Sequence, residues 1–223
     1  MDVKLISTTK SLIENNENLT AEQLIVYCAR VSNPSNQLNN ETADKLIAYL
    51  IKSKHWSPFE MVDMTVEIKT SRAISLQIVR HRSFSFQEFS QRYSEVAAME
   101  PVQLRKAGST NRQSSTESFD PEMCNNTILA SKLIEKHLAD SESLYKDLLA
   151  SGVAKECARM VLPATTETTI YVKGSVRSWI HYLQIRADEH SQLEHQQIAL
   201  KILEIFEEQF PNITKALNLC QNK

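Results

Sequence analysis

Glycine is the residue that most restricts what this chain can fold into, because its 223 residues include only three: Gly108, Gly152 and Gly174. Phosphate-binding loops of the GxGxxG and Walker types need closely spaced glycines, so that backbone N–H groups can approach the phosphate. Neither motif occurs in this sequence. We therefore expect any phosphate to be held by side chains or by helix N-termini, which directs attention to the arginines.

Length and composition predict a single folded domain over residues 1–223. Hydrophobic residues make up 42% of the chain and charged residues 23%, as in ordinary globular proteins, and no linker-like segment divides it. The formal net charge is -2, whereas domains that coat nucleic acid are usually strongly basic. We therefore expect no nucleic-acid partner, and any group of basic residues must be a local feature.

The cysteines and the N-terminal residues predict a cytoplasmic protein. Cys28, Cys124, Cys157 and Cys220 are far apart and form no CxxC pair, so neither a zinc ribbon nor a disulfide framework is expected. The first ten residues lack the basic start and apolar run of a signal peptide. No stretch approaches the ~20 apolar residues of a membrane span, so we expect no membrane partner.

The hydrophobic pattern predicts a chain that contains both strands and helices. Residues 62–70 alternate between apolar and polar, as in a half-buried strand, and Thr20 and Gln23 have the spacing of a capping box at a helix start. Residues 101–120 are polar and aperiodic and are expected to form a surface loop. Further strands are expected over 2–7 and 168–174, and helices over 20–32, 40–52, 71–81, 126–150 (ending before Gly152), 154–162, 175–190 and 193–211.

The stretch RHRSFSFQEFSQRY, residues 80–93, contains three arginines, three serines and three phenylalanines. At its start, Gln77, Arg80 and His81 have i, i+3 and i+4 spacing, which places them near one another if the preceding helix continues through them. Arginine offers a planar fork that suits phosphate, and aromatic rings can pack on a flat heterocycle. A solvated basic helix end, favoured by the helix dipole, explains the spacing equally well.

The second half of this stretch has an alternating pattern. If the chain beyond Ser85 is extended, successive side chains project to opposite sides. One side would then carry Glu88, Ser90 and Arg92, and the other would carry Phe89, Gln91 and Tyr93.

Arg186 occupies a position where the helical pattern predicts an apolar residue, at the end of an apolar stripe that runs from Val176 to Leu183. A buried arginine is costly unless an anion or a polar group meets it. On pattern alone, an ion pair with Asp188 or Glu189 is slightly favoured over a contact with a ligand.

Three other polar residues have ordinary explanations when each is considered alone. Arg159 has Glu156 at i,i+3 spacing, His55 precedes a proline turn, and His181 fits the exposed surface of a helix. The sequence HSQLEH resembles a metalloprotease motif, but its two histidines are five residues apart and do not share a helix face. We therefore expect no metal site, and the absence of a GxSxG elbow gives no reason to expect a serine hydrolase.

The stretch 80–93 is similar to the signature of flavin-dependent thymidylate synthases, in which Arg-His-Arg is followed, seven residues later, by Ser. Here these residues are Arg80, His81, Arg82 and Ser90, and the family-like pair Arg-Tyr follows at 92–93. The resemblance continues in HWSPFE (55–60), LQIVRHR (76–82), SGVAKECARMVLP (151–163) and RSWIHYLQIRADEHSQLEHQQ (177–197), and it covers most of the chain from about Ser32 to Phe210. Several spaced motifs in the same order make this match specific.

The resemblance implies an α+β fold, with a mixed sheet flanked by helices, that assembles as a homotetramer. Each active site of such an assembly is built from several subunits. The family reaction methylates dUMP to dTMP, with 5,10-methylenetetrahydrofolate as carbon donor, FAD as hydride carrier and NADPH as reductant. The expected partners are therefore dUMP, folate and other copies of the chain.

The resemblance also implies roles for matched residues. Arg186 is expected to favour ionisation at N3 of the uracil, as a cation that stabilises the developing charge. Ser90 is expected to bind substrate through its hydroxyl group, because no histidine is placed by sequence to activate it. The residues expected to contact FAD are Ser57, Arg80, His81, Arg82, Glu88, Ser175, Val176, Arg177 and His181, with His55 and Ser32 near the flavin. Those expected to surround dUMP are Gln77, Arg80, Glu88, Phe89, Ser90, Gln91, Arg92, Arg159 and Arg186.

Three positions depart from the family pattern. Gln87 stands where the signature commonly has Asn, and Ser175 and His181 stand where the family often has Asn. All three side chains can form hydrogen bonds. Two other functions remain open: a nucleotide- or RNA-binding module that uses the same basic aromatic cluster, and a flavoprotein of the same fold that acts on another substrate.

Overall fold

The computed structural model describes residues 1–13, 19–95, 98–109, 115–123, 125 and 127–219. Its contacts group into two compact units, and each is described by itself. The first unit comprises Met1 with residues 69–80 and 87–170, and the second comprises residues 2–68, 81–86 and 171–223. Strands β2 (Asp63–Ser71) and β8 (Glu167–Ser175) each pass from one unit into the other. The single domain expected over residues 1–223 stays a prediction.

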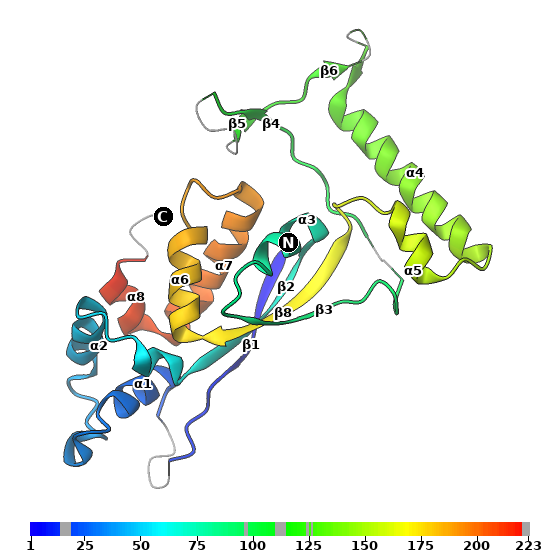
Figure 1. Cartoon of the computed structure of the whole chain (residues 1–223). Coiled ribbons are helices and arrows are strands. Elements are labelled where there is room, and N and C mark those ends of the chain that lie inside the picture. The colour runs from blue at the N-terminus through cyan, green and yellow to red at the C-terminus, as the bar shows by residue number, and fades with distance from the viewer. Residues whose placement is uncertain (14–18, 96–97, 110–114, 124, 126, 220–223) are drawn as a thin grey trace. The chain divides into compact units, whose positions relative to one another are not determined.

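One sheet contains four strands in the order β1-β2-β8-β3, so β2 and β8 are its central pair (Figure 1). The outer strands are β1 (Asp2–Thr8) and β3 (Ser85–Glu88). The alternation expected in β2 is confirmed, because Met64, Val66 and Ile68 are fully buried while Thr65 and Glu67 are half-buried. The strands expected over 2–7, 62–70 and 168–174 are all present.

The second unit is helical outside its strands. Its core includes Trp179, Phe206, Phe210 and Ile213, all fully buried. Helix α7 packs on α6, on α8 and against β1. The helices are α1 (Ala21–Ala29), α2 (Ala43–Lys52), α6 (Val176–Arg186), α7 (Leu193–Gln209) and α8 (Pro211–Leu217), with short 3-10 turns η1 (Pro34–Asn36) and η2 (Ser57–Glu60).

The helix starts in this unit follow their capping residues. Thr20 forms the expected capping box with Gln23, each side chain accepting a hydrogen bond from the other residue's backbone N–H. Ser175 caps α6, as expected, through a hydrogen bond from the backbone N–H of Ser178 to its Oγ. Helix α8 was not expected. It begins at Pro211, whose fixed φ suits the first position of a helix.

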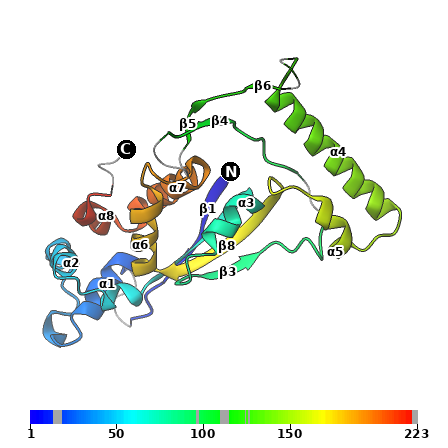
Figure 2. The same cartoon turned by 45° about the horizontal axis from the view of Figure 1, so that its top comes forward.

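The first unit contains α3 (Arg72–Ile78), α4 (Ala130–Ala150), α5 (Lys155–Ala158) and the 3-10 turn η3 (Arg159–Val161). Helix α5 lies beside α4 (Figures 1 and 2). The helix expected before Gly152 ends as predicted, and Gly152 has the positive φ of 84° that is common just beyond a helix end. The short helix expected before Pro163 is present as α5 and η3.

Two expectations for the first unit are wrong in part. The loop expected over 101–120 contains a hairpin in which β4 (Arg105–Ala107) pairs antiparallel with β5 (Ser115–Ser118). The helix expected from residue 126 begins at Ala130, because Ile128–Leu129 form strand β7, paired with β6 (Glu122–Met123). Three residues named above, Cys124, Asn126 and Cys220, lie outside the described residues. The other two cysteines, Cys28 and Cys157, are free thiols.

Gly174 precedes the start of α6 and leaves room for the ring of Phe84. A Cβ atom at position 174 would lie 2.3 Å from Cδ1 of Phe84. Because Phe84 is buried, with its ring centroid 4.5 Å from that of Trp179, Gly174→Ala is expected to lower the free energy of unfolding by about 1–3 kcal/mol. Denaturant titration measures the change, with the exposed Lys173→Ala on the same strand as control. Equal stability of Gly174→Ala and the unsubstituted protein would contradict this close packing.

Candidate active site

The stretch 80–93 contributes to both units: Arg80 belongs to the first, residues 81–86 to the second, and residues 87–93 to the first. Helix α3 ends at Ile78, and the N–H of Arg80 donates to the carbonyl of Gln77 at 3.3 Å. This i to i+3 bond tightens the chain into a turn that ends the helix. The helix ends before Arg80 and His81, so the expectation that Gln77, Arg80 and His81 share one helix face is wrong.

The extended conformation that would give an alternating pattern stops at Glu88, where β3 ends. The carbonyl of Ser90 accepts from the backbone N–H groups of Tyr93 at 3.1 Å and Ser94 at 3.0 Å. These bonds form a turn, so Glu88, Ser90 and Arg92 do not follow one another along one side of a strand.

Arg186 and His81 are in direct contact within the second unit. Arg186 ends α6, and its Nε donates to Nε2 of His81 at 2.9 Å. His81 therefore accepts at Nε2 and is neutral, with its ring proton on Nδ1. The ion pair expected with Asp188 or Glu189 is wrong, because the helix ends at Arg186 and the carboxylate of Asp188 accepts from the backbone N–H of His190 instead.

Two buried polar side chains lie next to this contact. The ring of Tyr182 has its centroid 5.0 Å from that of His81, and its hydroxyl is hydrogen-bonded to Nε2 of the fully buried His195 at 3.1 Å. Burial raises the pKa of Tyr182. Burial, together with the charges of Arg186 and His81, lowers the pKa of His195 to about 3. Burial, Arg186 and His181 lower the pKa of His81 to about 4.

His81 and His195 predict a loss of stability in mild acid. Each has an ordinary pKa near 6.5 in the unfolded chain, so between about pH 6.5 and pH 4 the unfolded chain binds protons that the folded chain does not. The free energy of unfolding is expected to fall by up to about 1.4 kcal/mol per pH unit for each histidine. Urea titrations at a series of pH values measure this slope. His195→Leu should reduce this slope by the contribution of close to one bound proton, about 1.4 kcal/mol per pH unit. An unchanged slope would contradict the burial of a neutral imidazole.

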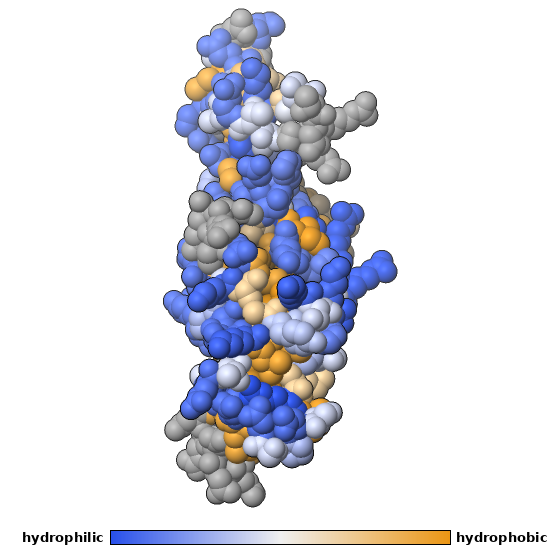
Figure 3. Space-filling model, turned by 90° about the vertical axis from the view of Figure 1, so that its left-hand side faces the viewer, coloured by the Kyte–Doolittle hydropathy of each residue, from blue (hydrophilic) through white to orange (hydrophobic). Residues whose placement is uncertain are grey.

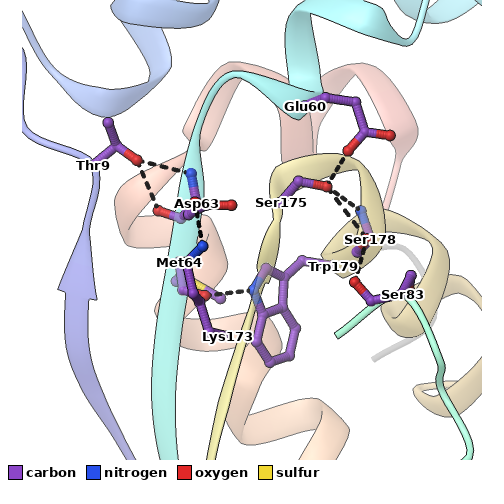
Figure 4. Close-up of polar contacts among 9 residues, drawn as sticks. All are labelled: Thr9, Glu60, Asp63, Met64, Ser83, Lys173, Ser175, Ser178 and Trp179. Atoms are coloured by element: carbon purple, nitrogen blue, oxygen red, sulfur yellow. Dashed lines mark hydrogen bonds and ion pairs between the residues drawn. The ribbon is translucent and has the colours of Figure 1, made fainter. Parts of the chain in front are cut away.

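Glu60, at the end of η2, joins two residues at the start of α6, and Figure 4 shows its bond to the first of them, Ser175. Its Oε2 accepts from Oγ of Ser175 at 2.5 Å, and its Oε1 accepts from Nη1 of Arg177 at 3.0 Å. Further along the helix, Oγ of Ser178 donates to the carbonyl of Ser83 at 3.4 Å. These bonds connect the helix start to η2 and to the turn that follows His81.

A pocket of about 420 Å³ opens beside this cluster. Of the residues expected to contact FAD, it contains Arg177 and His181. Sequence reasoning missed Trp56, Glu60 and Ser83. The first two lie in the matched motif HWSPFE, and the third lies in the stretch 80–93. The signal that could have found them is a polar or aromatic residue that lies inside a matched motif and has no assigned role. The full lining is Trp56, Glu60, Ser83, Arg177, Ser178, Ile180, His181 and Gln184.

Four other residues expected near the flavin lie elsewhere in the second unit. Ser32 lines a separate pocket of about 440 Å³, and the ring of His55 meets that of Tyr49 edge-on at 5.9 Å. Ser57 is the exposed first residue of η2. Val176 is fully buried, and its backbone N–H donates to the carbonyl of Val62, just before β2, at 2.8 Å. A larger pocket of about 510 Å³ beside α1 and α2 contains none of the expected site residues.

Glu88 has a well-defined set of partners in the first unit. Its Oε1 accepts from Nη1 of Arg72 at 2.5 Å, from Oγ of Ser75 at 2.9 Å and from Oγ1 of Thr168 at 3.0 Å. A carboxylate that accepts several bonds, one of them from a guanidinium, is held in one orientation. Sequence reasoning assigned a role to Glu88 but missed the three residues that hold it.

The other residues expected around dUMP also belong to the first unit, apart from Arg186. Gln91 is 9% exposed, and its Nε2 has no hydrogen-bond partner among the described residues. Arg159 was considered as an ion-pair partner of Glu156, but its Nε donates to the backbone carbonyl of that residue at 3.4 Å. Phe89 is 37% exposed, and Ser90 and Arg92 are exposed.

Three arginines of the stretch 80–93 are available to an anion. Arg80, Arg82 and Arg92 are exposed, and within the part of the chain that the structure describes their side chains make no hydrogen bond or ion pair. An unpaired guanidinium keeps its planar fork free for a bidentate contact with phosphate.

The described residues include no group of three or more His, Cys, Asp or Glu side chains placed to hold a metal ion. Among the same residues, no helix has both the length and the apolar character needed to cross a membrane.

Comparison with known proteins identifies the family. A family model described as "Thymidylate synthase complementing protein" matches residues 11–212. The chain is also 49% identical, over 219 residues, to a protein of Paramecium bursaria Chlorella virus 1 named "Probable flavin-dependent thymidylate synthase", covering 98% of this chain and 99% of that relative. This chain belongs to the flavin-dependent thymidylate synthase family. The resemblance found in the stretch 80–93 is confirmed.

Other members and a solved structure agree with this assignment. The flavin-dependent thymidylate synthase of a Synechocystis strain is 49% identical over 218 residues, covering 97% of this chain and 99% of that one. A crystal structure of the UMP/dUMP methylase PolB from Streptomyces cacaoi, bound with 5-Br dUMP, matches with a TM-score of 0.79 and 27% identity, covering 97% of this chain and 94% of that chain. The mixed α and β architecture expected from the family signature is therefore confirmed.

Proposed function

We propose that this chain methylates dUMP to dTMP, with 5,10-methylenetetrahydrofolate as carbon donor, FAD as hydride carrier and NADPH as reductant. Membership of the flavin-dependent thymidylate synthase family supports the proposal. The structural observation that carries it is the contact between Arg186 and His81 at 2.9 Å. This contact joins the arginine assigned to the uracil to a histidine assigned to the flavin.

The residues of the second unit fit a flavin dinucleotide. The pocket of about 420 Å³ combines the indole of Trp56, a guanidinium and an imidazole, which suits a flat heterocycle with polar edges. When bound there, FAD supplies the hydride transfer. We assign FAD contacts in this unit to Ser57, His81, Arg82, Ser175, Val176, Arg177 and His181, with His55 and Ser32 nearby. Arg80 and Glu88, which belong to the first unit, are assigned to FAD as well.

Arg186 stabilises negative charge on the uracil. Its Nε is occupied by His81, which leaves the Nη groups of the guanidinium for a ligand. Neutral His81 orients the guanidinium without adding a second positive charge. A fixed cation in a site that excludes water is the kind of group that stabilises charge developing in a transition state.

Residues of the first unit are assigned to the nucleotide. Glu88 is held through Oε1, so its Oε2 can accept from a hydroxyl or an imide N–H. The buried amide of Gln91 lacks an acceptor among the described residues, and a ligand oxygen would supply one. Ser90 binds through its hydroxyl. The full set assigned to dUMP is Gln77, Arg80, Glu88, Phe89, Ser90, Gln91, Arg92, Arg159 and Arg186.

The same proposal includes assembly as a homotetramer with shared active sites. On the face drawn in Figure 3, apolar residues are gathered among the hydrophilic ones. Large apolar side chains of the second unit that are more than half exposed include Val31, Tyr49 and Met61, and where such side chains form one contiguous patch they mark a contact surface. Light scattering coupled to size exclusion should give four times the mass of one chain; the mass of a single chain would contradict the assembly.

A cytoplasmic location is also proposed. Cys28 and Cys157 are free thiols, which a reducing compartment maintains.

Turnover with defined substrates tests the function. Purified protein supplied with FAD should be yellow and should form dTMP only when dUMP, 5,10-methylenetetrahydrofolate and NADPH are all present. A preparation that neither binds FAD nor forms dTMP would contradict the proposal. Omitting each component in turn is the control, because a flavoprotein acting on another substrate would oxidise NADPH without forming dTMP.

A further inference from the structure

Two buried polar side chains near Arg186 have no part in the proposed function: Tyr182 of α6 and His195 of α7. They are 1% and 0% exposed, and the hydroxyl of Tyr182 is hydrogen-bonded to Nε2 of His195 at 3.1 Å. The buried residues that follow on α7, such as Ile198 and Ile202, are apolar. Burying polar groups costs free energy even when they pair, and what a paired set contributes is one fixed arrangement of the side chains around it.

The ring of His81 packs against both members of this pair. Its centroid lies 5.0 Å from that of Tyr182 and 6.4 Å from that of His195, with interplanar angles of 69° and 87°. Phe84 is a third edge-on neighbour, at 6.3 Å and 71°. Edge-to-face contacts with several rings leave an imidazole few orientations. The lone pair on Nε2 of His81 therefore stays directed at Nε of Arg186, 2.9 Å away.

Residues at and just before the start of α7 also hold the backbone around Arg186. Helices α6 and α7 lie side by side (Figures 1 and 2). Nε2 of Gln196 donates to the carbonyl of Ala187 at 3.3 Å, and Oγ of Ser191 donates to the carbonyl of Ile185 at 2.9 Å. These two carbonyls belong to the residues on either side of Arg186. The freedom that remains to Arg186 is therefore that of its side chain.

We propose that Tyr182 and His195 are positioning residues for Arg186. Their hydrogen bond fixes to α7 the ring on which His81 packs, and His81 in turn accepts from Nε, which sets the direction of the two Nη groups. The inference rests on the proposed function, because it takes Arg186 as the group that stabilises charge on the uracil. A displacement of about 1 Å in such a group can lower a rate by up to about a hundredfold.

Substitutions at the pair test the proposal. Tyr182→Phe keeps the ring and removes its hydrogen bond to α7, so kcat for dTMP formation is expected to fall about fivefold to tenfold with all substrates saturating. His195→Leu removes the other partner and should have an effect of the same size. His195→Gln offers both a donor and an acceptor and should restore most of the activity. A kcat within about twofold of the unsubstituted protein in Tyr182→Phe would overturn the proposal, and so would a Gln variant as slow as the Leu variant.

Combination with Arg186→Ala separates positioning from a general disturbance of the fold. If Tyr182 acts through Arg186, Tyr182→Phe should change kcat by less than about twofold once the guanidinium is absent, because effects of coupled residues do not add. A purely structural effect would lower kcat by the same factor in both backgrounds. That additive result would overturn the proposal.

The tautomer of His81 is a readout that needs no turnover. Because Nε2 accepts from Arg186, the ring proton of His81 lies on Nδ1. The chain has six histidines, and nitrogen NMR of FAD-loaded protein labelled in these rings should show this single tautomer, with the signal assigned by its loss in His81→Gln. Tyr182→Phe should give a mixture of the two neutral tautomers. A single unchanged tautomer in that variant would overturn the proposal.

Ile202→Val is the control for lost stability. It removes one buried methyl group from α7, about two turns beyond His195, and should leave kcat unchanged. The unfolding temperature of each variant verifies folding, and Tyr182→Phe, which keeps the shape of the native ring, decides the question if His195→Leu does not fold. Failure of the proposed function looks different, because the unsubstituted protein then forms no dTMP, while the tautomer of His81 still shows whether the pair fixes that ring.

Discussion

Arg186→Ala is expected to lower kcat by about a hundredfold to a thousandfold while FAD remains bound. The guanidinium is assigned to the charge that develops on the uracil, and removal of one such group from an active site typically has an effect of this size. Loss of Arg186 also leaves Nε2 of His81 without its donor. Turnover of dUMP measures the loss of kcat, and the visible spectrum of the flavin shows whether FAD remains bound.

Two further variants make the Arg186 result specific. Arg186→Lys retains the charge but not the planar fork that reaches both His81 and a ligand, so only partial activity is expected. Glu189→Gln, at an exposed position just beyond the same helix, should leave kcat unchanged. If Arg186→Ala has unchanged kcat, Arg186 has no part in the chemistry.

Arg80→Ala is expected to weaken the binding of both FAD and dUMP by about tenfold to a hundredfold each. Arg80 is assigned to both ligands, and a hydrogen bond to a charged group contributes about 1.5–3 kcal/mol. Its side chain is exposed and has no partner among the described residues, so the unfolding temperature should not change. Equilibrium titrations with each ligand and a thermal unfolding curve measure the three quantities.

The control for Arg80 is Lys69→Ala, which removes an exposed cation of the same unit. It should leave both affinities unchanged and so exclude a general effect of net charge. Normal affinity of Arg80→Ala for both ligands would refute the shared placement, and loss of one ligand alone would assign Arg80 to that ligand only.

Periodicity predicted the elements of the fold better than their ends. The clean alternation in β2 and the Ser175 cap of α6 are local features, and both are present as expected. The helix end at Ile78 and the turn at Ser90 were not predicted, because each depends on one or two backbone hydrogen bonds that leave no pattern in side-chain polarity. Helix α8 is not among the expected elements, because the apolar pattern that reaches Pro211 predicts one helix ending there, whereas Pro211 begins the next helix.

The contacts of the site were less accessible to sequence reasoning than its residues. The place of Arg186 at the end of an apolar stripe indicates a polar partner and favours an anion, but the partner of this half-buried side chain is the neutral ring of His81, 105 residues away. The bond between Glu60 and Arg177 spans 117 residues. Contacts between residues so far apart in the sequence depend on how whole helices and strands pack. A single sequence, without related sequences beside it, carries no record of such contacts.

The central claim is that this chain binds FAD and dUMP together, with Arg80 assigned to both ligands. A titration of the FAD-loaded protein with dUMP, followed by the visible spectrum of the flavin, tests this most directly. We predict a saturable change in the spectrum with dUMP, which is weakened in Arg80→Ala. A flavin spectrum that does not respond to dUMP, while it responds to another ligand, would contradict the joint binding of FAD and dUMP.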